Sequence, residues 1–189
     1  MKWFPLRKSS LEHLSVSMAG IKLGNRLLVV GCADPMLIAQ LAVKTGLTGR
    51  AFAVDEDAQA VTAAAQTALR EGALVETATV KWGALPLESE SFDVAIVRDV
   101  LPRLTADARN ACLSEVQRVL RPGGRCLVID GKGRQRVAAS LRSRPAAGDY
   151  AAPEGPVHVL LAQGFKAARL LAEREGLLFA EAVKPMSGH

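Results

Sequence analysis

The amino-acid sequence predicts an α/β fold with one doubly wound, mostly parallel sheet and helices on both faces. Three observations predict it: short apolar runs alternate with segments of helical period from Arg26 onward, the junctions carry turn or cap residues, and 189 residues suit a single core. Such alternation is typical of βαβ units, whose right-handed crossovers bury both faces of a sheet. We therefore expect one domain over residues 1–189.

Each expected strand is a short apolar or alternating run, and each expected helix is a longer segment between cap residues. The strands are expected at 27–30, 50–54, 75–81, 92–97, 126–129 and 177–183, and the helices at 35–45, 57–70, 105–120 and 157–175. Residues 1–20 are expected to form an amphipathic N-terminal arm. Residues 131–156 are expected to form a long loop, with a short helical piece at 137–142.

Cap residues mark the helix boundaries. Asp34 fits an N-cap, and Pro35 fits the first helical position, where a backbone N–H is not needed. Thr105 fits the N-cap of a later helix, and Gly46 fits the C-terminal end of the first one. A Pro-Gly-Gly turn at 122–124 is expected to lead into the fifth strand.

Only one strand, 177–183, is expected after the last helix, so the sheet would be truncated at its C-terminal end. An apolar edge strand exposes N–H and C=O groups that can pair with another chain. Lys184 and Pro185, which could block such pairing, lie beyond the strand. Because twofold assembly is the commonest closed oligomer, we predict a homodimer in which a second copy pairs with this edge or covers it.

The positive charge is concentrated in one segment. The net charge is +5, yet residues 118–144 hold eight Lys and Arg against one acid, Asp130. The pI of about 9.4 therefore describes this segment and not the whole chain. A charge run of this kind is most often a solvated loop, and it also fits an anionic partner.

The cysteines and histidines form no metal or disulfide pattern. They are Cys32, Cys112, Cys126, His13, His158 and His189, far apart in the sequence and without CxxC spacing. No signal-peptide pattern and no long apolar span is present. We expect a soluble, cytoplasmic protein without a metal ion, in which Cys32 is a small packed side chain.

The ends of the first two strands form a candidate ligand site, because ligands of open parallel sheets bind at carboxyl ends where the strand order reverses. Gly31 lets the backbone turn tightly beside a ligand, and the helix after it presents free N–H groups. Asp55 ends the second strand, where its two carboxylate oxygens can accept hydrogen bonds from adjacent ribose hydroxyls. The alternative is an ordinary turn glycine and a helix-initiating acid.

Four segments resemble class I S-adenosylmethionine-dependent methyltransferases, particularly the ubiquinone and menaquinone biosynthesis C-methyltransferases. They are Leu-Val-Val-Gly-Cys at 28–32, Ala-Val-Asp at 53–55, Leu-Pro-Leu through Ser-Phe-Asp-Val at 85–94, and Leu-Arg-Pro-Gly-Gly at 120–124. The resemblance covers about residues 27–129. It implies methyl transfer from S-adenosylmethionine to a small-molecule acceptor.

The resemblance also assigns residues to the cofactor. These are Gly31, Cys32, Ala33, Asp55, Glu56, Trp82, Gly83, Ala84 and Arg98. By this resemblance, the first three would lie along the methionine, the two acids would hold the ribose and border the adenine, and residues 82–84 would form the other adenine wall. Arg98 and Asp99 would face the donor methyl and the acceptor. Asp99 could act as a base or bind the acceptor, or it could be a surface acid that caps the next turn.

The chain departs from the family pattern around the cofactor. Ala33 and Pro35 stand where the family usually has glycines, and Glu56 replaces an apolar residue. Lys81-Trp82-Gly83 stands where the family commonly has an acid. The alternative function is therefore a non-catalytic domain of the same fold that acts by interaction.

Two other classes are disfavoured by motif. A nicotinamide dehydrogenase needs Gly-x-Gly-x-x-Gly, and only Gly31 matches, since Ala33 and Met36 occupy the other positions. Arg-Asp-Val-Leu-Pro at 98–102 lacks the Asn/Asp-Pro-Pro-Tyr motif of many methylases that modify nucleic-acid amino groups. A nucleic-acid acceptor is therefore not expected.

Overall fold

The computed structural model describes residues 6–131, 150, 155–174 and 176–186, with side chains described from residue 13 onward. The strands are β1 (Arg26–Val30), β2 (Arg50–Asp55), β3 (Glu76–Thr79), β4 (Phe92–Arg98), β5 (Leu120–Gly131), β6 (Lys166–Arg174) and β7 (Leu177–Val183). The helices are α1 (Leu6–Ala19), α2 (Pro35–Thr45), α3 (Ala58–Arg70), α4 (Ala106–Val119) and α6 (Gly155–Ala162), with a 3-10 turn η1 (Leu101–Arg103). The predicted α/β fold is confirmed.

Within the described residues, the strands form a seven-stranded sheet in the order β3-β2-β1-β4-β5-β7-β6. The pairs among β3, β2, β1, β4 and β5 are parallel, whereas β7 is antiparallel to both β5 and β6. The chain runs outward from β1 to β3 and then returns to β4 on the other side of β1. This reversal between β1 and β4 is the switch point at which such sheets bind ligands.

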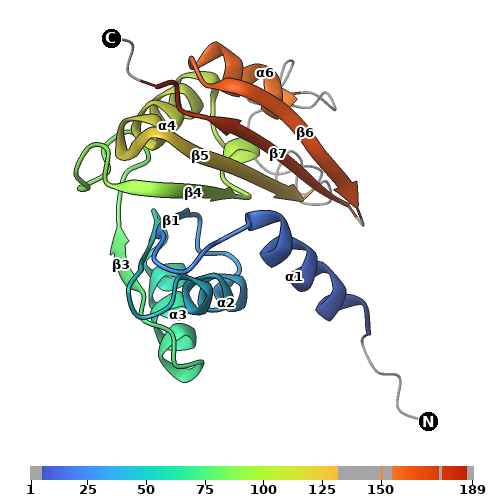
Figure 1. Ribbon diagram of the computed structural model, residues 1–189. Coiled ribbons are helices and arrows are strands. Elements are labelled where there is room, and N and C mark those ends of the chain that lie inside the picture. The colour runs from blue at the N-terminus through green and yellow to red at the C-terminus, as the bar shows by residue number, and fades with distance from the viewer. Residues whose placement is uncertain (1–5, 132–149, 151–154, 175, 187–189) are drawn as a thin grey trace.

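Helices cover both faces of the sheet, as Figure 1 shows, with α1, α2 and α3 on one side and α4 and α6 on the other. Alternate residues of β1 serve the two layers, because successive strand side chains point to opposite faces. Leu27 and Val29 pack in one apolar cluster with α2 and α3, and Leu28 and Val30 pack in a second with α4 and α6. The core therefore lies in two layers that hold the strand ends in place.

The predicted helix caps are confirmed. The Asp34 carboxylate accepts a hydrogen bond from the Leu37 N–H at 3.2 Å, and Pro35 is the first residue of α2. The Thr105 hydroxyl accepts from the Ala108 N–H at 3.3 Å at the start of α4. Each cap satisfies a backbone donor that the helix leaves without an intrahelical partner.

The start of β5 differs from its prediction. The strand was expected at 126–129, but β5 begins at Leu120 directly after α4, and the turn expected at 122–124 lies within it. The register between β4 and β5 shifts between Phe92 and Val94, so this first part pairs irregularly. Lys184 exchanges backbone hydrogen bonds with Gly123 and Gly124, which holds the irregular segment against the end of β7.

The prediction of one helix over residues 157–175 is wrong. Its first part forms α6, but the chain turns at Gly164, whose φ is +86°, and continues as β6. Buried Phe165 anchors the turn, and its N–H donates to the Leu160 carbonyl at 3.1 Å. Antiparallel pairing with β7 overrides a local sequence that favours a helix.

The expected truncation of the sheet is wrong for the same reason. Two strands follow α6, and β7 lies between β5 and β6, so 177–183 is not an edge. The edge strand β6 has two register shifts and carries exposed charges at Lys166, Arg169 and Arg174. Bulges and charges of this kind discourage pairing with another chain. The homodimer stays a prediction, without the edge at 177–183 on which it rested.

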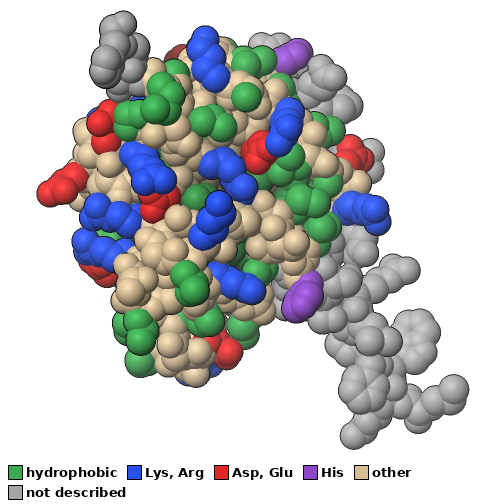
Figure 2. All heavy atoms as spheres, viewed as in Figure 1, with side chains coloured by type: hydrophobic (Ala, Val, Ile, Leu, Met, Phe, Trp, Pro, Cys, Tyr) green, Lys and Arg blue, Asp and Glu red, His purple; other side chains and the backbone are tan. Residues whose placement is uncertain are grey.

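The described part of the basic segment is engaged within the fold. Arg118 pairs with Glu115 at 2.8 Å, Arg121 pairs with Asp93 at 2.8 Å, and the Arg125 guanidinium lies 3.7 Å from Glu181. Figure 2 shows Lys and Arg side chains spread over one face among acidic and apolar ones. The other basic residues of the segment, most of the loop predicted at 131–156 and its helical piece at 137–142 lie outside the described residues.

Arg125 also fastens α1 to the sheet, so we expect Arg125→Ala to loosen this helix. The guanidinium donates to the carbonyls of Met18, at 2.8 Å, and Ala19, which are terminal acceptors of α1. Losing charged hydrogen bonds should lower the free energy of unfolding by about 1.5–3 kcal/mol and speed amide exchange in α1. Arg121→Ala is the matched control, because its exposed ion pair should contribute about 1 kcal/mol or less. Equal exchange in both variants would contradict this role for Arg125.

Candidate functional site

Polar residues gather where four neighbouring strands end. Cys32 follows β1, Asp55 ends β2, Arg98 ends β4 and Asp130 lies near the end of β5. These strands are adjacent and parallel, so their carboxyl ends meet at one edge of the sheet. The structure therefore brings the motif residues of the first, second and fourth strands to the switch point, together with an acid of the fifth.

Asp55 fastens the ends of β1 and β2 together. One carboxylate oxygen accepts from the Cys32 N–H at 2.7 Å, and the other accepts from the Asp57 N–H at 3.0 Å. The side chain is buried, with 4% of the residue exposed. Asp55 therefore supports the turn that leads into α3, whose N-cap is Asp57. Because a carboxylate oxygen has two lone pairs, each oxygen retains capacity to accept a ligand hydroxyl.

Gly31 permits the close approach of β1 and β4. Its φ is +104°, a conformation that side-chain-bearing residues rarely adopt. A Cβ atom at this position would lie 2.3 Å from the Arg98 carbonyl oxygen and 2.8 Å from a Val100 methyl. The glycine is thus required by the packing of the strand ends themselves, whatever the site binds.

Glu56 and Trp82 are also brought together. The Glu56 carboxylate accepts from the Trp82 backbone N–H at 3.3 Å, which joins the turn after β2 to the chain after β3. The Trp82 side chain is buried in the apolar cluster shared with α4, while Gly83 and Ala84 are exposed. Residues 82–84 were expected to form a wall beside the adenine. Only the backbone and small side chains of Gly83 and Ala84 are exposed there.

Arg98 spans the space between three strand ends. Its guanidinium lies 3.4 Å from Asp99, 3.9 Å from Asp34 and 3.5 Å from the Ile129 carbonyl. These contacts are long for charged hydrogen bonds, and Nε is buried without a hydrogen-bond partner in the described part of the chain. Sequence reasoning interpreted Asp34 as a helix cap and missed its place beside Arg98.

Asp99 is not the surface cap that was one of its expected roles. The residue is buried, has a φ of +53°, and its carboxylate accepts from the Gly131 N–H at 2.6 Å. No side chain caps the following η1 turn. Asp99 therefore ties the end of β4 to the end of β5, in a backbone conformation that non-glycine residues adopt mainly where tertiary contacts hold them.

Asp130 was not identified from the sequence as a site residue. It is buried, and its carboxylate accepts a hydrogen bond from the Tyr150 hydroxyl, whose ring lies 4.4 Å below the Arg109 guanidinium. Burial raises the pKa of Asp130 to about 7; the Tyr150 hydrogen bond opposes this shift and the charge of Asp99 adds to it. The available signal was its position, since it follows the apolar run of the fifth strand as Asp55 follows that of the second.

Cys32 is a packed side chain, as expected. Burial, together with the charge of Asp55, raises the pKa of its thiol to about 12, so the reactive thiolate is not formed near neutral pH. Its backbone N–H, which bonds Asp55, is the part of Cys32 that shapes the site. Ala33, next along the loop, is exposed.

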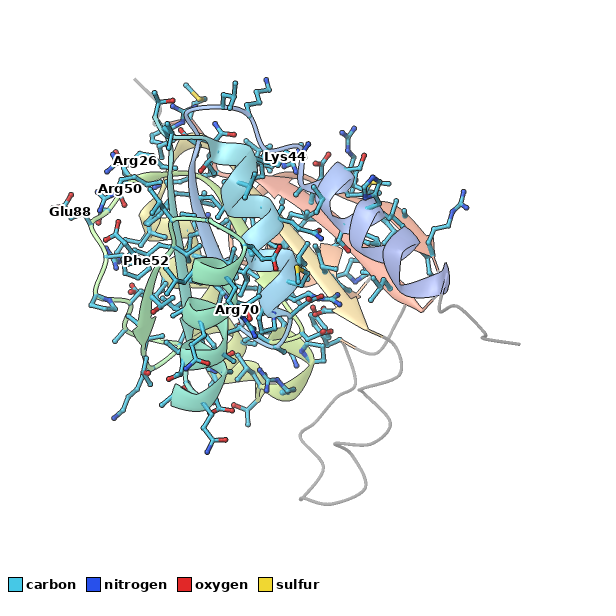
Figure 3. The ribbon with its side chains drawn as sticks, turned by 90° about the horizontal axis from the view of Figure 1, so that it is seen from below. Arg26, Lys44, Arg50, Phe52, Arg70 and Glu88 are labelled. Carbon is cyan, nitrogen blue, oxygen red and sulfur yellow. The ribbon has the colours of Figure 1, made fainter. Side chains whose placement is uncertain are left out.

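Two hollows of the described surface lie away from these strand ends. One, of about 220 Å³, is lined by Arg26, Arg50 and Phe52, which lie together on one side of the molecule in Figure 3. The other, of about 590 Å³, lies between α1 and α2 and is lined by His13 and Lys44 among others. Neither contains a residue that the motifs assign to a cofactor.

Among the described residues, no helix is long and apolar enough to cross a membrane.

Comparison with known proteins agrees with the motifs. The methyltransferase domain family model matches residues 28–128. The ubiquinone/menaquinone biosynthesis C-methyltransferase of Laribacter hongkongensis is 28% identical over 119 residues, which are 63% of this chain and 48% of that protein. The corresponding protein of Chromobacterium violaceum is 26% identical over the same shares. The chain thus spans about half the length of these curated relatives.

Solved structures show the same architecture. An S-adenosylmethionine-dependent methyltransferase from Aquifex aeolicus superposes with a TM-score of 0.75 at 20% identity, over 97% of this chain and all of that one. The [4+2]-cyclase SpnF superposes with a TM-score of 0.69 at 19% identity, over 94% and 81% of the two chains. At these identities the likeness shows the fold, which hosts more than one reaction. The family match over residues 28–128, on this fold and with these strand-end motifs, shows that the chain belongs to the class I S-adenosylmethionine-dependent methyltransferases, whose cofactor is S-adenosylmethionine.

Proposed function

We propose that this protein transfers a methyl group from S-adenosylmethionine to a small-molecule acceptor at the carboxyl ends of β1, β2 and β4. The observation that carries the proposal is the buried Asp55 carboxylate at the switch point, in contact with the β1 loop. A carboxylate in this place suits a ribose diol. Family membership supports the cofactor, and the strand-end geometry supports the location.

The residues of this chain fit the cofactor in three places. Asp55 keeps lone pairs for the ribose hydroxyls, and exposed Gly83 and Ala84 are small residues near Glu56, where the resemblance places the adenine. The Arg98 guanidinium, whose ion-pair contacts with Asp34 and Asp99 are long, suits the methionine carboxylate. Cys32 and Ala33 would then lie along the methionine part of the cofactor, as the family resemblance implies.

When bound, the cofactor supplies a sulfonium methyl group that is open to in-line attack. The work of this chain is therefore to bind and orient, since alignment of reactants can supply much of the rate. Arg98 and the acids beside it, Asp34 and Asp99, set the charge around the reacting centre. The tight joins of β1 with β2 and β4 keep these groups at fixed positions.

The acceptor that the relatives suggest is a quinone precursor. The curated relatives are named as C-methyltransferases of ubiquinone and menaquinone biosynthesis. A small aromatic acceptor methylated at carbon is therefore our specific proposal for the substrate. A nucleic-acid acceptor remains disfavoured by the motif after β4.

A non-catalytic interaction domain is the second candidate, and Arg98 is the observation that favours it. Its guanidinium reaches across the switch point toward Asp34 of the β1–α2 loop. A side chain in this place could fill a pocket that no longer binds a cofactor. Calorimetric titration with S-adenosylmethionine separates the candidates: micromolar binding supports the enzyme, and absence of binding supports the interaction domain.

Asp55→Ala should weaken S-adenosylmethionine binding by about 1–3 kcal/mol, the range for losing charged hydrogen bonds to a buried acceptor. The variant should also be less stable than the parent, because the Cys32 and Asp57 N–H groups lose their acceptor. Asp57→Asn is the matched control, since the exposed Asp57 caps α3 and Asn is an equally good cap. Calorimetry that gives the same affinity for folded Asp55→Ala and the parent would reject the ribose assignment.

A further inference from the structure

We propose that the loops before β1 and β2 dock this protein on the surface of an anionic lipid bilayer. Residues 20–26 and 43–50, together called the loop tip, combine exposed aliphatic side chains with cations and contain no acid. The loop tip lies at the amino ends of these strands, whereas the proposed methyl transfer is placed at the carboxyl ends. The inference therefore goes beyond the proposed function and does not rest on it.

Three large aliphatic side chains project from the loop tip. Leu23 is 79% exposed, Val43 is 54% exposed and Leu47 is 94% exposed. The two loops are in contact, because a Cβ atom at Gly46 would lie 2.7 Å from a Leu23 methyl. The Gly46 N–H also donates to the Val43 carbonyl at 3.2 Å. Single exposed leucines are common on protein surfaces, but an apolar patch marks a site of interaction.

The backbone of the loop tip has its hydrogen bonds within the protein. The Gly24 N–H donates to the Thr45 carbonyl at 2.8 Å, which joins the two loops. The Arg50 N–H donates to the Asn25 carbonyl at 3.1 Å. The Asn25 side chain in turn accepts from the Lys22 N–H at 2.9 Å. These N–H groups are therefore already paired when the tip enters a region of low polarity, where an unpaired backbone group is costly.

The charge of the loop tip is positive. Its cations are Lys22, Arg26, Lys44 and Arg50. Arg50 pairs with Glu76 at 2.6 Å, whereas the other three side chains make no ion pair with a described residue. Figure 3 shows Arg26, Arg50 and Lys44 toward the same end of the molecule. Cations near the surface of an anionic membrane each strengthen binding by about fivefold.

The hollow between α1 and α2 continues the apolar patch into the protein. Its volume is about 590 Å³, and it shares Val43 and Lys44 with the loop tip. Val16 and Ile21 add to its apolar lining, which also includes one acid, Glu71. An apolar hollow beside a cation suits the acyl chain of a lipid whose anionic headgroup lies at Lys44.

The size and composition of the loop tip favour a lipid surface over a protein partner. Stable protein interfaces bury about 800 Å² on each partner and are enriched in aromatic side chains. The loop tip has no aromatic residue and only three large exposed apolar side chains. Insertion between lipid headgroups needs no complementary surface, because apolar burial and attraction to anionic lipids act together. Such docking needs no helix that spans the bilayer.

Cosedimentation with vesicles tests the apolar part of the proposal. The full chain is mixed with vesicles of equal parts phosphatidylcholine and phosphatidylglycerol, or of phosphatidylcholine alone. We expect binding to the mixed vesicles that salt weakens, and binding at least about tenfold weaker to the neutral ones. Leu47→Ser should weaken binding to the mixed vesicles by about tenfold, because a leucine no longer inserts. Leu161→Ser, at an exposed leucine of α6 on the other face of the sheet, is the matched control and should bind as the parent does.

Lys44→Glu tests the electrostatic part. Replacing a cation by an anion should weaken binding to the mixed vesicles by about 25-fold, fivefold for each unit of charge. Lys166→Glu, at an exposed position of β6, changes the net charge equally and should have a much smaller effect. Equal losses in the two variants would show that the vesicles sense only the net charge, and would overturn the loop tip as the docking surface.

A fluorescent label locates the contact directly. Leu47→Cys offers an exposed thiol, whereas the native Cys32, Cys112 and Cys126 are buried, and burial raises the pKa of each native thiol to about 12. An environment-sensitive thiol dye therefore reacts at position 47. Its emission should shift to the blue on the mixed vesicles, and the same dye on Leu161→Cys should show no shift.

The remaining outcomes decide against the proposal. If the parent binds neither kind of vesicle, or if Leu47→Ser binds as well as the parent, the inference is wrong. A dimer in light scattering that Leu47→Ser dissociates would show that a second copy covers the loop tip instead. Calorimetry with S-adenosylmethionine reports on the proposed function separately, because the loop tip and the cofactor residues lie at opposite ends of the strands.

Discussion

Gly31→Ala should destabilise the protein by about 2–6 kcal/mol. About 1–3 kcal/mol should come from the strained backbone conformation, and about 1–3 kcal/mol from overpacking against β4. The φ of +104° disfavours any side chain at this position. The new Cβ would also meet the Arg98 carbonyl at 2.3 Å, and backbone cannot move aside as a flexible side chain can. Because β1 and β4 would separate at the switch point, S-adenosylmethionine binding should be lost together with stability. Chemical denaturation and calorimetry measure the two effects.

Gly72→Ala is the matched control for this prediction. Gly72 also has a positive φ, +69°, but nothing lies within 4 Å of the position that its Cβ would take. This variant should therefore show the conformational part alone, about 1–3 kcal/mol, with cofactor binding unchanged. Equal destabilisation of the two variants would mean that the contact between Gly31 and β4 is unimportant.

The parent protein should lose stability as the pH rises from about 4 to about 7. Asp130→Asn should remove most of this loss. The pKa of Asp130 is about 7 in the folded protein, against a usual value of 3.8, because burial disfavours the charged carboxylate. The folded state therefore holds this proton more tightly than the unfolded state does. The free energy of unfolding falls across the window by about 1.4 kcal/mol per unit of pKa difference, and then levels off above pH 7.

Denaturation at several pH values checks this prediction. Other titrating groups are common to both proteins, so the stability of Asp130→Asn minus that of the parent should rise by several kcal/mol between pH 4 and pH 8. Asp107→Asn, which makes the same change at an exposed position of α4, is the matched control. Parallel curves for Asp130→Asn and the parent would show that Asp130 is not a buried carboxyl with a raised pKa.

Much of the site could be predicted because its signals are local. Asp34, Pro35 and Thr105 carry their cap roles in their own side chains, and the structure confirms each one. Asp55 was identified from its position after an apolar strand, and the structure places it against the loop after β1. Its contact with the ribose remains a proposal, since the hydrogen bonds in the structure are all to backbone.

Other contacts of the site could not be predicted, because the two residues that make each contact lie far apart in the sequence. Arg98 meets Asp34 across 64 positions of sequence, and Asp99 meets the Gly131 N–H across 32. Asp130 was counted only as the one acid in a basic segment, since its tyrosine partner follows 20 residues later. No local pattern specifies such pairs, because they depend on which strand ends become neighbours.

The sequence by itself determined the class of fold, the succession of parallel strands and helix caps along the chain, and the family, since these depend on short periodic patterns and contiguous motifs. Tertiary structure alone decided that residues 166–174 are the edge strand β6, because pairing with β7 outweighs a local preference for helix. It also decided which acid keeps a free oxygen, because hydrogen bonds between strand ends engage Asp99 and leave Asp130 Oδ1 enclosed without a partner in the described residues. Burial and long-range pairing are properties of the assembled sheet, and no segment of the chain contains them alone.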